Sequence, residues 1–276
     1  MKIKLTQLLI YVFLVTIMMF NVAPFYWMII SSLKTDAEAY AIPPTWWPKQ
    51  PTLYEGYIKV LMWTNFPRYF FNSLIVSLGS ALLSTFVGAL AGYGFSRFYF
   101  KGRSVLMGVL LSSQMLPGVL LVGPYFKLLA KVGLYNSYTG LILAFCTLTL
   151  PFSAWMLKGF IDTVPHELDE AAMIDGCSRL HAFFRVVFPL ITPGMVATLI
   201  FAFLLAWGDL LWVLCLTSTE SMATVTLGLS RLVTQFRVIW PQLMAGSMIA
   251  TIPPVVLYLV LQNYLVKGLT GGAVKE

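Results

Sequence analysis

Apolar residues in this chain gather into long runs separated by shorter, more polar stretches. A helix needs about 20 mostly apolar residues to cross the hydrocarbon core of a membrane. Six runs reach that length, and Asp209 is the one charged residue inside any of them. The pattern predicts an all-α integral membrane protein with six transmembrane helices, over Leu8–Ile30, Ser73–Phe95, Val105–Phe126, Tyr138–Leu157, Met195–Leu216 and Leu243–Val266.

Proline and glycine recur inside these runs, where in water they would argue against helices. In a membrane bundle, neighbouring helices and local waters satisfy the backbone groups that such residues leave free. The six assignments therefore hold despite Pro24, Pro117, Pro151, Pro253 and Pro254. Gly88 and Gly92 have the spacing with which two membrane helices approach closely, so we interpret them as helix-packing residues.

The composition is also that of a membrane protein. Hydrophobic residues make up 59% of the chain and charged residues 11%, against about 45–50% and about 25% in a soluble domain. The first run exceeds the roughly 7–15 residues of a secretory apolar region, so we interpret it as an uncleaved span. The net charge of +7 comes from basic residues scattered singly between the runs, which argues against nucleic-acid binding.

Six spans place both termini on one side of the membrane. A cytoplasmic N-terminus puts ten of the 18 Lys and Arg residues inside, and the positive-inside rule favours this orientation. We therefore expect one transmembrane domain over 1–276 with both termini cytoplasmic. Its external segments are 31–72, 127–137 and 217–242, and its long cytoplasmic loop is 158–190. Proline and tryptophan in the first external segment favour an extended stretch at the membrane interface.

The cytoplasmic loop carries local signals for two short helices. Pro165 suits a first helical turn, and Glu167, Asp169 and Glu170 follow where the helix dipole favours negative charge. Gly176 is a natural helix stop. Ser178 is a suitable cap for a second helix, which we expect Pro189 to end.

The two helices differ in character. Ala171 and Ala172 leave one patch of the first helix thin, so that another surface could come close. The second helix carries an apolar face that would anchor the loop to its own bundle, formed by Phe183, Phe184, Val186 and Phe188. Such a loop suits insertion into a groove of a soluble partner, and it equally suits an amphipathic element lying on lipid. Spacing alone leaves both interpretations open.

The same loop resembles the EAA loop of binding-protein-dependent ABC importer permeases. That motif reads Glu-Ala-Ala, three residues, Gly, nine residues, Ile-x-Leu-Pro, and this chain has it with Val186 for Ile and Phe188 for Leu. The resemblance implies that the loop docks an ATPase subunit. The residues that it assigns to docking are Glu170, Ala171, Ala172, Asp175, Gly176, Val186, Phe188 and Pro189.

The resemblance covers nearly the whole chain and is closest to the smaller, six-span subunit of the maltose-type carbohydrate branch. It rests on stretches such as Leu90–Arg97, Gln114–Pro117 and Leu134–Gly140, with Gly208 departing from the family's usual Asn. It implies a multi-pass inner-membrane permease that imports a sugar or sugar-like solute. The implied partners are a second permease subunit, an ABC ATPase dimer, an extracytoplasmic solute-binding protein and membrane lipid, without nucleic acid.

The resemblance further implies that the C-terminal tail contacts the ATPase, through Lys267, Gly268, Thr270, Gly271 and Gly272. Composition alone favours a flexible terminus for this glycine-rich stretch. No phosphate-binding sequence of the G-x-x-x-x-G-K-[ST] type occurs in the chain, so it is not expected to hydrolyse ATP. We expect ATP and Mg²⁺ on the partner ATPase and no cofactor on this chain.

Two other functions compete with the importer permease. A secondary transporter or channel commonly carries ionisable residues in its spans, and Asp209 offers thin support for one. Trp207 and Asp209 are candidates for lining the solute pathway, although a structural hydrogen bond is the simpler role for Asp209. A membrane enzyme is disfavoured because His166 and His181 lack ligand-like spacing, and we expect neither a catalytic residue nor a metal site.

Overall fold

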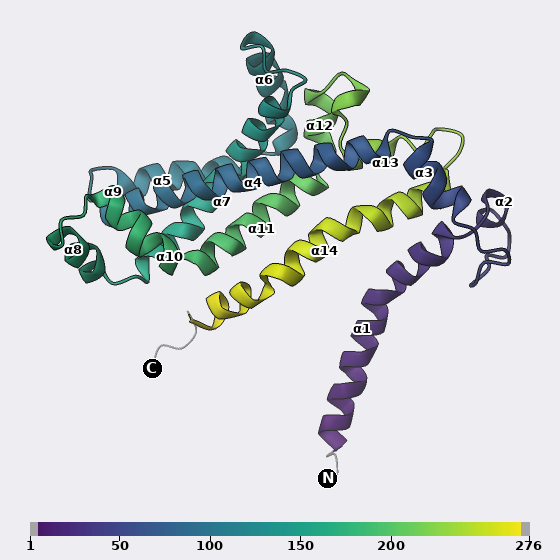
Figure 1. Cartoon of the computed structure of the whole chain (residues 1–276), viewed down its shortest axis with the longest axis horizontal. Coiled ribbons are helices and arrows are strands. Elements are labelled where there is room, and N and C mark those ends of the chain that lie inside the picture. The colour runs from purple at the N-terminus through teal and green to yellow at the C-terminus, as the bar shows by residue number, and fades with distance from the viewer. Residues whose placement is uncertain (1–4, 272–276) are drawn as a thin grey trace. The chain divides into compact units, whose positions relative to one another are not determined.

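The computed structural model describes residues 5–271 and is built of helices (Figure 1). Four helices are long and apolar enough to cross a membrane: α1 (Leu5–Ser32), α4 (Phe66–Arg97), α7 (Tyr138–Asp162) and α14 (Trp240–Gly271). Pro24, Pro151, Pro253 and Pro254 all lie inside these helices. The expectation that helices of a membrane bundle accommodate proline is confirmed for three of these spans, α1, α7 and α14.

The prediction of one continuous helix over Val105–Phe126 was wrong. The segment forms α5 (Arg103–Ser112), a 3-10 turn (Ser113–Met115) and α6 (Gly118–Lys131), and the chain bends by 102° between the two arms. Leu116 is extended, with φ −74° and ψ 128°. Steric clash with a following proline disfavours the helical region for the preceding residue, so Pro117 breaks the helix here.

The predicted span over Met195–Leu216 is also divided. It consists of α11 (Thr192–Gly208) and α12 (Leu211–Leu216), with Asp209 extended at φ −78° and ψ 135° between them. The Asp209 carboxylate accepts a hydrogen bond from the Trp212 backbone N–H at 2.8 Å. Aspartate satisfies free N–H groups at the start of a helix, so the Asp209 side chain supports the start of α12 at Leu211 rather than continuing α11. Up to six spans result if two bent pairs are each counted as one span, namely Arg103–Met115 with Gly118–Lys131 and Arg179–Leu190 with Thr192–Gly208.

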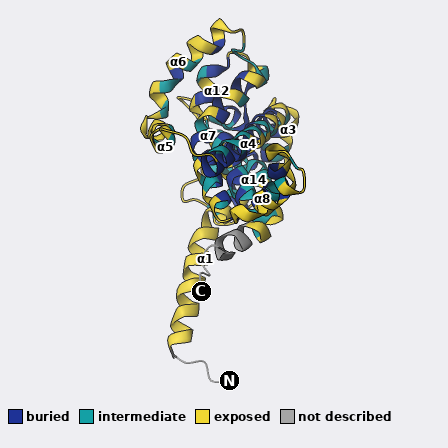
Figure 2. Cartoon of the chain, turned by 90° about the vertical axis from the view of Figure 1, so that its left-hand side faces the viewer, coloured by how far each residue is buried: buried dark blue, intermediate teal, exposed yellow. Residues whose placement is uncertain are grey.

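The described residues fall into two units, each with its own packing. The first comprises the N-terminal segment through Pro67 together with Gly228–Ile252. Figure 2 shows α1 exposed along most of its length, whereas Ile30, Ser31 and Ser32 at its end are buried. Helical elements flank the Pro- and Trp-containing stretch predicted to be extended: α2 (Asp36–Ala39) precedes it, and a π-helical turn (Tyr54–Ile58) and α3 (Lys59–Met62) follow it. Residues 40–53 between them contain no helix. Polar contacts order this segment: Lys34 Nζ donates to the Thr45 carbonyl at 2.6 Å, and Arg237 pairs with Asp36 at 3.0 Å.

The second unit, Arg68–Leu227 with the rest of the chain from Pro253, has α4, α7 and α11 at its centre. A Cβ on Gly88 would stand 2.7 Å from the Ser153 Cβ, and one on Gly92 would stand 2.8 Å from the Lys158 backbone nitrogen. These glycines let α4 lie directly against α7, which confirms their packing role. Shorter elements complete the chain: α8 (His166–Ile174), α9 (Arg179–Ala182), α10 (Phe188–Leu190) and α13 (Val225–Ser230).

The C-terminal stretch differs from the predicted flexible tail. α14 continues beyond the expected end near Val266 and includes Lys267, Gly268, Thr270 and Gly271, whereas Gly272 lies outside the described residues. No proline follows Pro254. Adding a residue to an existing helix gains one hydrogen bond without a new nucleation cost, so the helix propagates into this segment.

Candidate coupling loop

The first helix of the loop over residues 158–190 ends as the sequence predicts. α8 stops at Ile174, and Gly176 adopts φ +89°, which favours glycine. The Gly176 N–H donates to the Met173 carbonyl at 3.1 Å, and the Cys177 N–H donates to the Ala172 carbonyl at 3.0 Å. This pair of bonds is the Schellman motif, which satisfies the last carbonyls of a helix. Gly176 therefore sets the turn between the two helices of the loop.

The helix starts also follow the sequence closely. Pro165, expected within the first turn of α8, lies one position before it at φ −55° and ψ 136°. The Ser178 hydroxyl accepts from the His181 N–H and caps α9, as predicted. A π-helical turn over Phe183–Val187 then leads into α10, which ends at Leu190, one residue beyond the predicted end at Pro189. The chain bends by 79° before it enters α11.

The second helix anchors the loop to the bundle through its apolar face. Phe183 and Val187 are fully buried against α4 and α7, and the Phe183 ring lies 4.9 Å from that of Tyr93. Phe188 packs against the same cluster. Val186 is half-buried, and Phe184 stacks on Phe86 while remaining exposed. The predicted anchoring face is therefore confirmed for Phe183 and Phe188, with Val187 as the buried residue that the sequence analysis missed.

A buried ion pair holds the first helix. Arg97 Nε lies 2.5 Å from Asp169 Oδ2, and the two side chains are 3% and 7% exposed. Arg97 Nη2 donates to the Val164 carbonyl at 2.8 Å, and Arg97 Nη1 lies 3.3 Å from His166 Nε2. Arg97 thus ties the last turn of α4 to the first turn of α8 (Figure 1). Sequence analysis missed this pair because nothing in a linear pattern relates residues separated by 72 positions.

The outward side of α8 presents carboxylates next to apolar side chains. Glu170, Ala171, Asp175 and Gly176 are exposed, as a docking surface requires, whereas Ala172 is buried beneath them. Ile174 is 86% exposed at the end of the helix. Pro189, on α10, is exposed as well. An exposed branched apolar residue at the tip of a well-held helix has the character of an interface anchor, and Ile174 is absent from the predicted docking set.

Trp207 and Asp209, the two pathway candidates, occupy different environments. Trp207 is buried between α4 and α11, stacks on Phe203 at 5.4 Å between ring centroids and meets Phe70 at 5.8 Å. It fills the core of the second unit. Asp209 is half-buried and lies at the helix break, where its backbone carbonyl also accepts from the Thr226 hydroxyl at 2.6 Å. The hydrogen bonds of Asp209 favour its structural role.

The histidines of the loop do not form a metal centre. Within residues 5–271, no cluster of three or more His, Cys, Asp and Glu side chains has a metal-binding arrangement. His166 contacts Arg97, and His181 is exposed on α9.

A helical membrane bundle that holds an exposed two-helix loop at one end is the architecture of an ABC importer permease. The chain belongs to the family described as binding-protein-dependent transport system inner membrane component, whose model matches residues 84–271. It is accordingly a multi-pass membrane protein and a permease subunit of an ABC importer.

Several characterised relatives match over most of their length. The inner membrane ABC transporter permease protein YcjP of Escherichia coli is 36% identical and covers 99% of this chain and 98% of its own. The sulfoquinovosyl glycerol permease SmoH of Agrobacterium fabrum is 35% identical over 91% of this chain and 88% of its own. The trehalose/maltose permease MalG of Thermococcus litoralis is 35% identical over 91% of both chains.

A solved structure has the same fold. One chain of a bacterial ABC transporter involved in the import of the acidic polysaccharide alginate superimposes with a TM-score of 0.80 at 17% identity, and it covers 94% of this chain and 95% of that chain. The likeness covers most of both chains and confirms the all-α fold.

Proposed function

We propose that this permease imports a sugar or sugar-like solute, delivered by an extracytoplasmic binding protein and driven by ATP hydrolysis on separate subunits. The observation that carries the substrate class is that relatives with 35% identity over 91% of this chain are named for trehalose/maltose and sulfoquinovosyl glycerol transport. A relative named for diacetylchitobiose uptake is 34% identical. All three solutes are sugars or sugar derivatives.

In this proposal the loop is the coupling element. The exposed side of α8, with Ile174 at its tip and Glu170 and Asp175 beside it, inserts into a groove of the ATPase. The Arg97–Asp169 pair fixes the start of α8 to α4, and the Phe183 anchor fixes the following helix to α4 and α7. Movement of the ATPase would therefore be transmitted to two spans through packed contacts rather than through a flexible tether.

The proposed orientation places both termini and the loop in the cytoplasm. Segments 31–72, 127–137 and 217–242 then face outward, toward the binding protein. A second permease subunit completes the pathway, and an ABC ATPase dimer binds ATP and Mg²⁺. The last turns of α14, including Lys267 and Gly268, would approach the ATPase from the same side as the loop. No step of ATP hydrolysis is assigned to this chain.

The two broken spans offer a place for the solute within the bundle. α6 and α12 begin directly after the breaks and lie against each other (Figure 1). The Tyr125 ring lies 4.9 Å from that of Trp212, and the Tyr125 hydroxyl donates to Thr147 at 2.8 Å. Interrupted helices at membrane depth are tolerated where they are buried in protein or line a cavity. We place the solute pathway beside these breaks.

A reconstitution experiment tests the function. The permease, its partner permease and the ATPase are purified together and placed in vesicles, with the binding protein and labelled sugars on the outside and ATP inside. Sugar uptake that requires both ATP and the binding protein is expected. Uptake that follows an ion gradient without ATP would instead establish the alternative, a secondary transporter.

A further inference from the structure

A continuous groove runs along the loop-bearing ends of α4, α5 and α7. It consists of three adjoining hollows of about 310, 800 and 630 Å³. Phe95 and Phe100 line both the first and the second, and Met107, Leu111 and Lys158 line both the second and the third. The floor of the groove is aromatic and aliphatic, and it extends along α7 to Trp155 and Phe152.

Three glycines from three helices keep this groove open. They are Gly94 of α4, Gly108 of α5 and Gly159 of α7. A Cβ at any of them would meet nothing within 4 Å, unlike a Cβ at Gly88 or Gly92. Glycine is unfavourable in the interior of a helix, and no neighbouring group within the described chain requires these three to lack a side chain. Because these glycines have no side chains, the groove is wider and stays open to the outside of the bundle.

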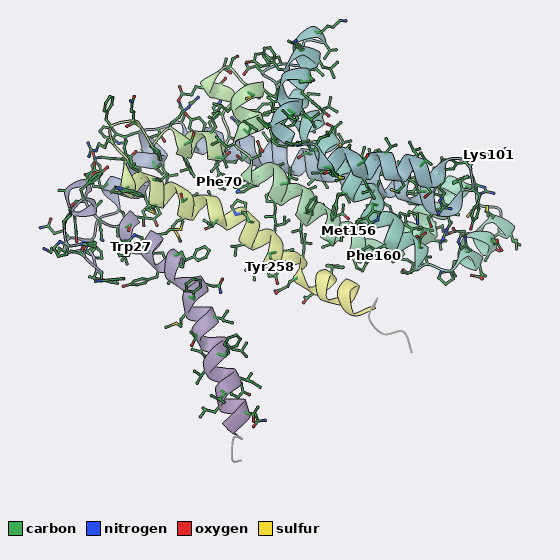
Figure 3. The ribbon with its side chains drawn as sticks, turned by 180° about the vertical axis from the view of Figure 1, so that it is seen from behind. Trp27, Phe70, Lys101, Met156, Phe160 and Tyr258 are labelled. Atoms are coloured by element: carbon green, nitrogen blue, oxygen red, sulfur yellow. The ribbon has the colours of Figure 1, made fainter. Side chains whose placement is uncertain are left out.

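Positive charge surrounds the outer end of the groove. Arg103 and Lys158 belong to its lining, and Lys101 lies exposed on the connection between α4 and α5. Arg179 lies over the Phe98 ring at 5.2 Å. Asp162 also lines the groove, and its carboxylate forms an ion pair with Lys158 at 2.5 Å. Figure 3 shows Lys101 at the outer end of this region, with Met156 and Phe160 further along the bundle.

We propose that the groove binds an anionic phospholipid from the leaflet that faces the coupling loop. Its phosphate lies at Lys101 and Arg103, and an acyl chain follows the floor past Met107 toward Trp155. A cationic rim above an apolar floor complements an amphiphile with a negative headgroup, and basic pockets between membrane helices bind such lipids. An apolar helix of a partner permease would bury the cationic rim without an opposite charge, which is unfavourable.

Tryptophan fluorescence tests the proposal, because Trp155 is 48% exposed in the groove. The assembled transporter is placed in phosphatidylcholine vesicles that contain a minor fraction of phosphatidylglycerol with brominated acyl chains, which quench on contact. The difference between the natural protein and Trp155→Phe isolates the Trp155 signal. We expect this signal to be quenched severalfold more than the mole fraction of phosphatidylglycerol predicts.

Two variants separate charge from space. Lys101→Gln with Arg103→Gln is expected to reduce the quenching to the level of the mole fraction, because each cation near the surface adds to the attraction of an anionic lipid. Gly108→Leu is expected to do the same by filling the groove without changing charge. The matched control, Lys127→Gln with Lys131→Gln, removes the same charge from exposed positions of α6 and is expected to leave the quenching unchanged.

Three results would overturn the proposal. In the first, the Trp155 signal of the natural protein is quenched only as much as the mole fraction of brominated phosphatidylglycerol predicts. In the second, brominated phosphatidylcholine quenches Trp155 with the same excess as brominated phosphatidylglycerol. The third is protection of Trp155 from both lipids, which would show that another protein chain covers the groove. Sugar uptake is measured separately, so loss of this site and loss of the proposed transport function are distinguishable.

Discussion

Arg97 and Asp169 form an ion pair at 2.5 Å between side chains that are almost completely buried. The pair joins the last turn of a membrane helix to the first turn of α8, which carries the proposed docking surface. Burial makes this connection sensitive to the loss of either partner, because removing one leaves an uncompensated charge away from water. The position of the loop therefore depends on two residues that lie outside the proposed docking surface.

Replacement of either partner alone should loosen the loop. We expect Arg97→Met or Asp169→Leu to destabilise the attachment of α8 by about 3–5 kcal/mol, whereas the double replacement should recover much of that loss. Hydrogen exchange of residues 163–177 in the assembled transporter measures the effect. If the double variant exchanged as fast as the two single variants, the ion pair would not be what holds α8.

Ile174 should act as the anchor of the ATPase contact. We expect Ile174→Glu to weaken assembly with the ATPase by at least about 2 kcal/mol, the level typical of interfacial anchors, while membrane insertion is unaffected. Co-purification yield and binding of the isolated ATPase to the permease measure this. Val132→Glu is the control, because Val132 is also exposed, at 56%, but lies at the end of α6. Equal loss in both variants would contradict a specific role for Ile174.

The backbone conformation of Gly176 should limit which residues the turn accepts. A Cβ there would meet nothing within 4 Å, so the restriction comes from φ +89° alone. We expect Gly176→Asn to be tolerated, Gly176→Ala to cost about 1 kcal/mol, and Gly176→Pro to abolish coupling because proline requires φ near −65°. ATPase stimulation by the loaded binding protein is the measurement. Transport by the proline variant at the natural rate would refute the assigned turn.

Gly92 should tolerate substitution less well than a glycine that has open space around it. An added Cβ would lie 2.8 Å from the Lys158 backbone nitrogen, so α4 and α7 would have to separate. We expect Gly92→Ala to destabilise the protein by about 1–3 kcal/mol, measured as a lower midpoint of thermal unfolding in detergent. Gly123→Ala in α6 is the matched control, since a Cβ there has open space. A midpoint unchanged by Gly92→Ala would show that the two helices separate without cost.

Acid should weaken the structure of the segment after α1. Burial acts to raise the pKa of the Glu38 carboxyl, but hydrogen bonds from the Lys49 N–H and the Thr45 hydroxyl, together with the charge of Lys34, outweigh it and lower the pKa. A lowered pKa means that Glu38 stabilises this segment above the pKa of the unfolded chain, and that the stabilisation is lost as pH falls through the folded value. Protease cleavage within residues 36–50 should therefore increase on acidification.

Glu38→Gln provides the comparison for this pH dependence. The amide does not titrate in this range, so the variant should be cleaved faster than the natural protein at neutral pH and should respond little to acid. Thr45 and Lys49 remain available to hydrogen bond with the new side chain, which limits the loss to the charged part of the interaction. Identical pH profiles for both proteins would assign the acid response to another group.

The sequence by itself determined the class of the protein and much of the local structure of the loop. Long apolar runs require lipid as the solvent, and in lipid a helix satisfies the hydrogen-bonding groups of its own backbone. This requirement accounts for α1, α4, α7 and α14. Gly176 and Ser178 act on the nearest backbone groups, so their turn and cap could be assigned from neighbours alone. The motif from Glu170 to Pro189 indicated the family because its spacing is a property of the chain.

Tertiary structure decided the features that depend on residues far apart. Pro117 and Asp209 were visible in the sequence, but a proline or an aspartate in a membrane helix has two outcomes, and Pro151 remains inside α7 whereas Pro117 ends a helix. Which outcome occurs depends on the helices that surround each position. The Arg97–Asp169 pair, the burial of Trp207 and the groove at Gly94, Gly108 and Gly159 arise only when α4, α5, α7 and α11 are packed, because burial and charge pairing are properties of neighbours in space.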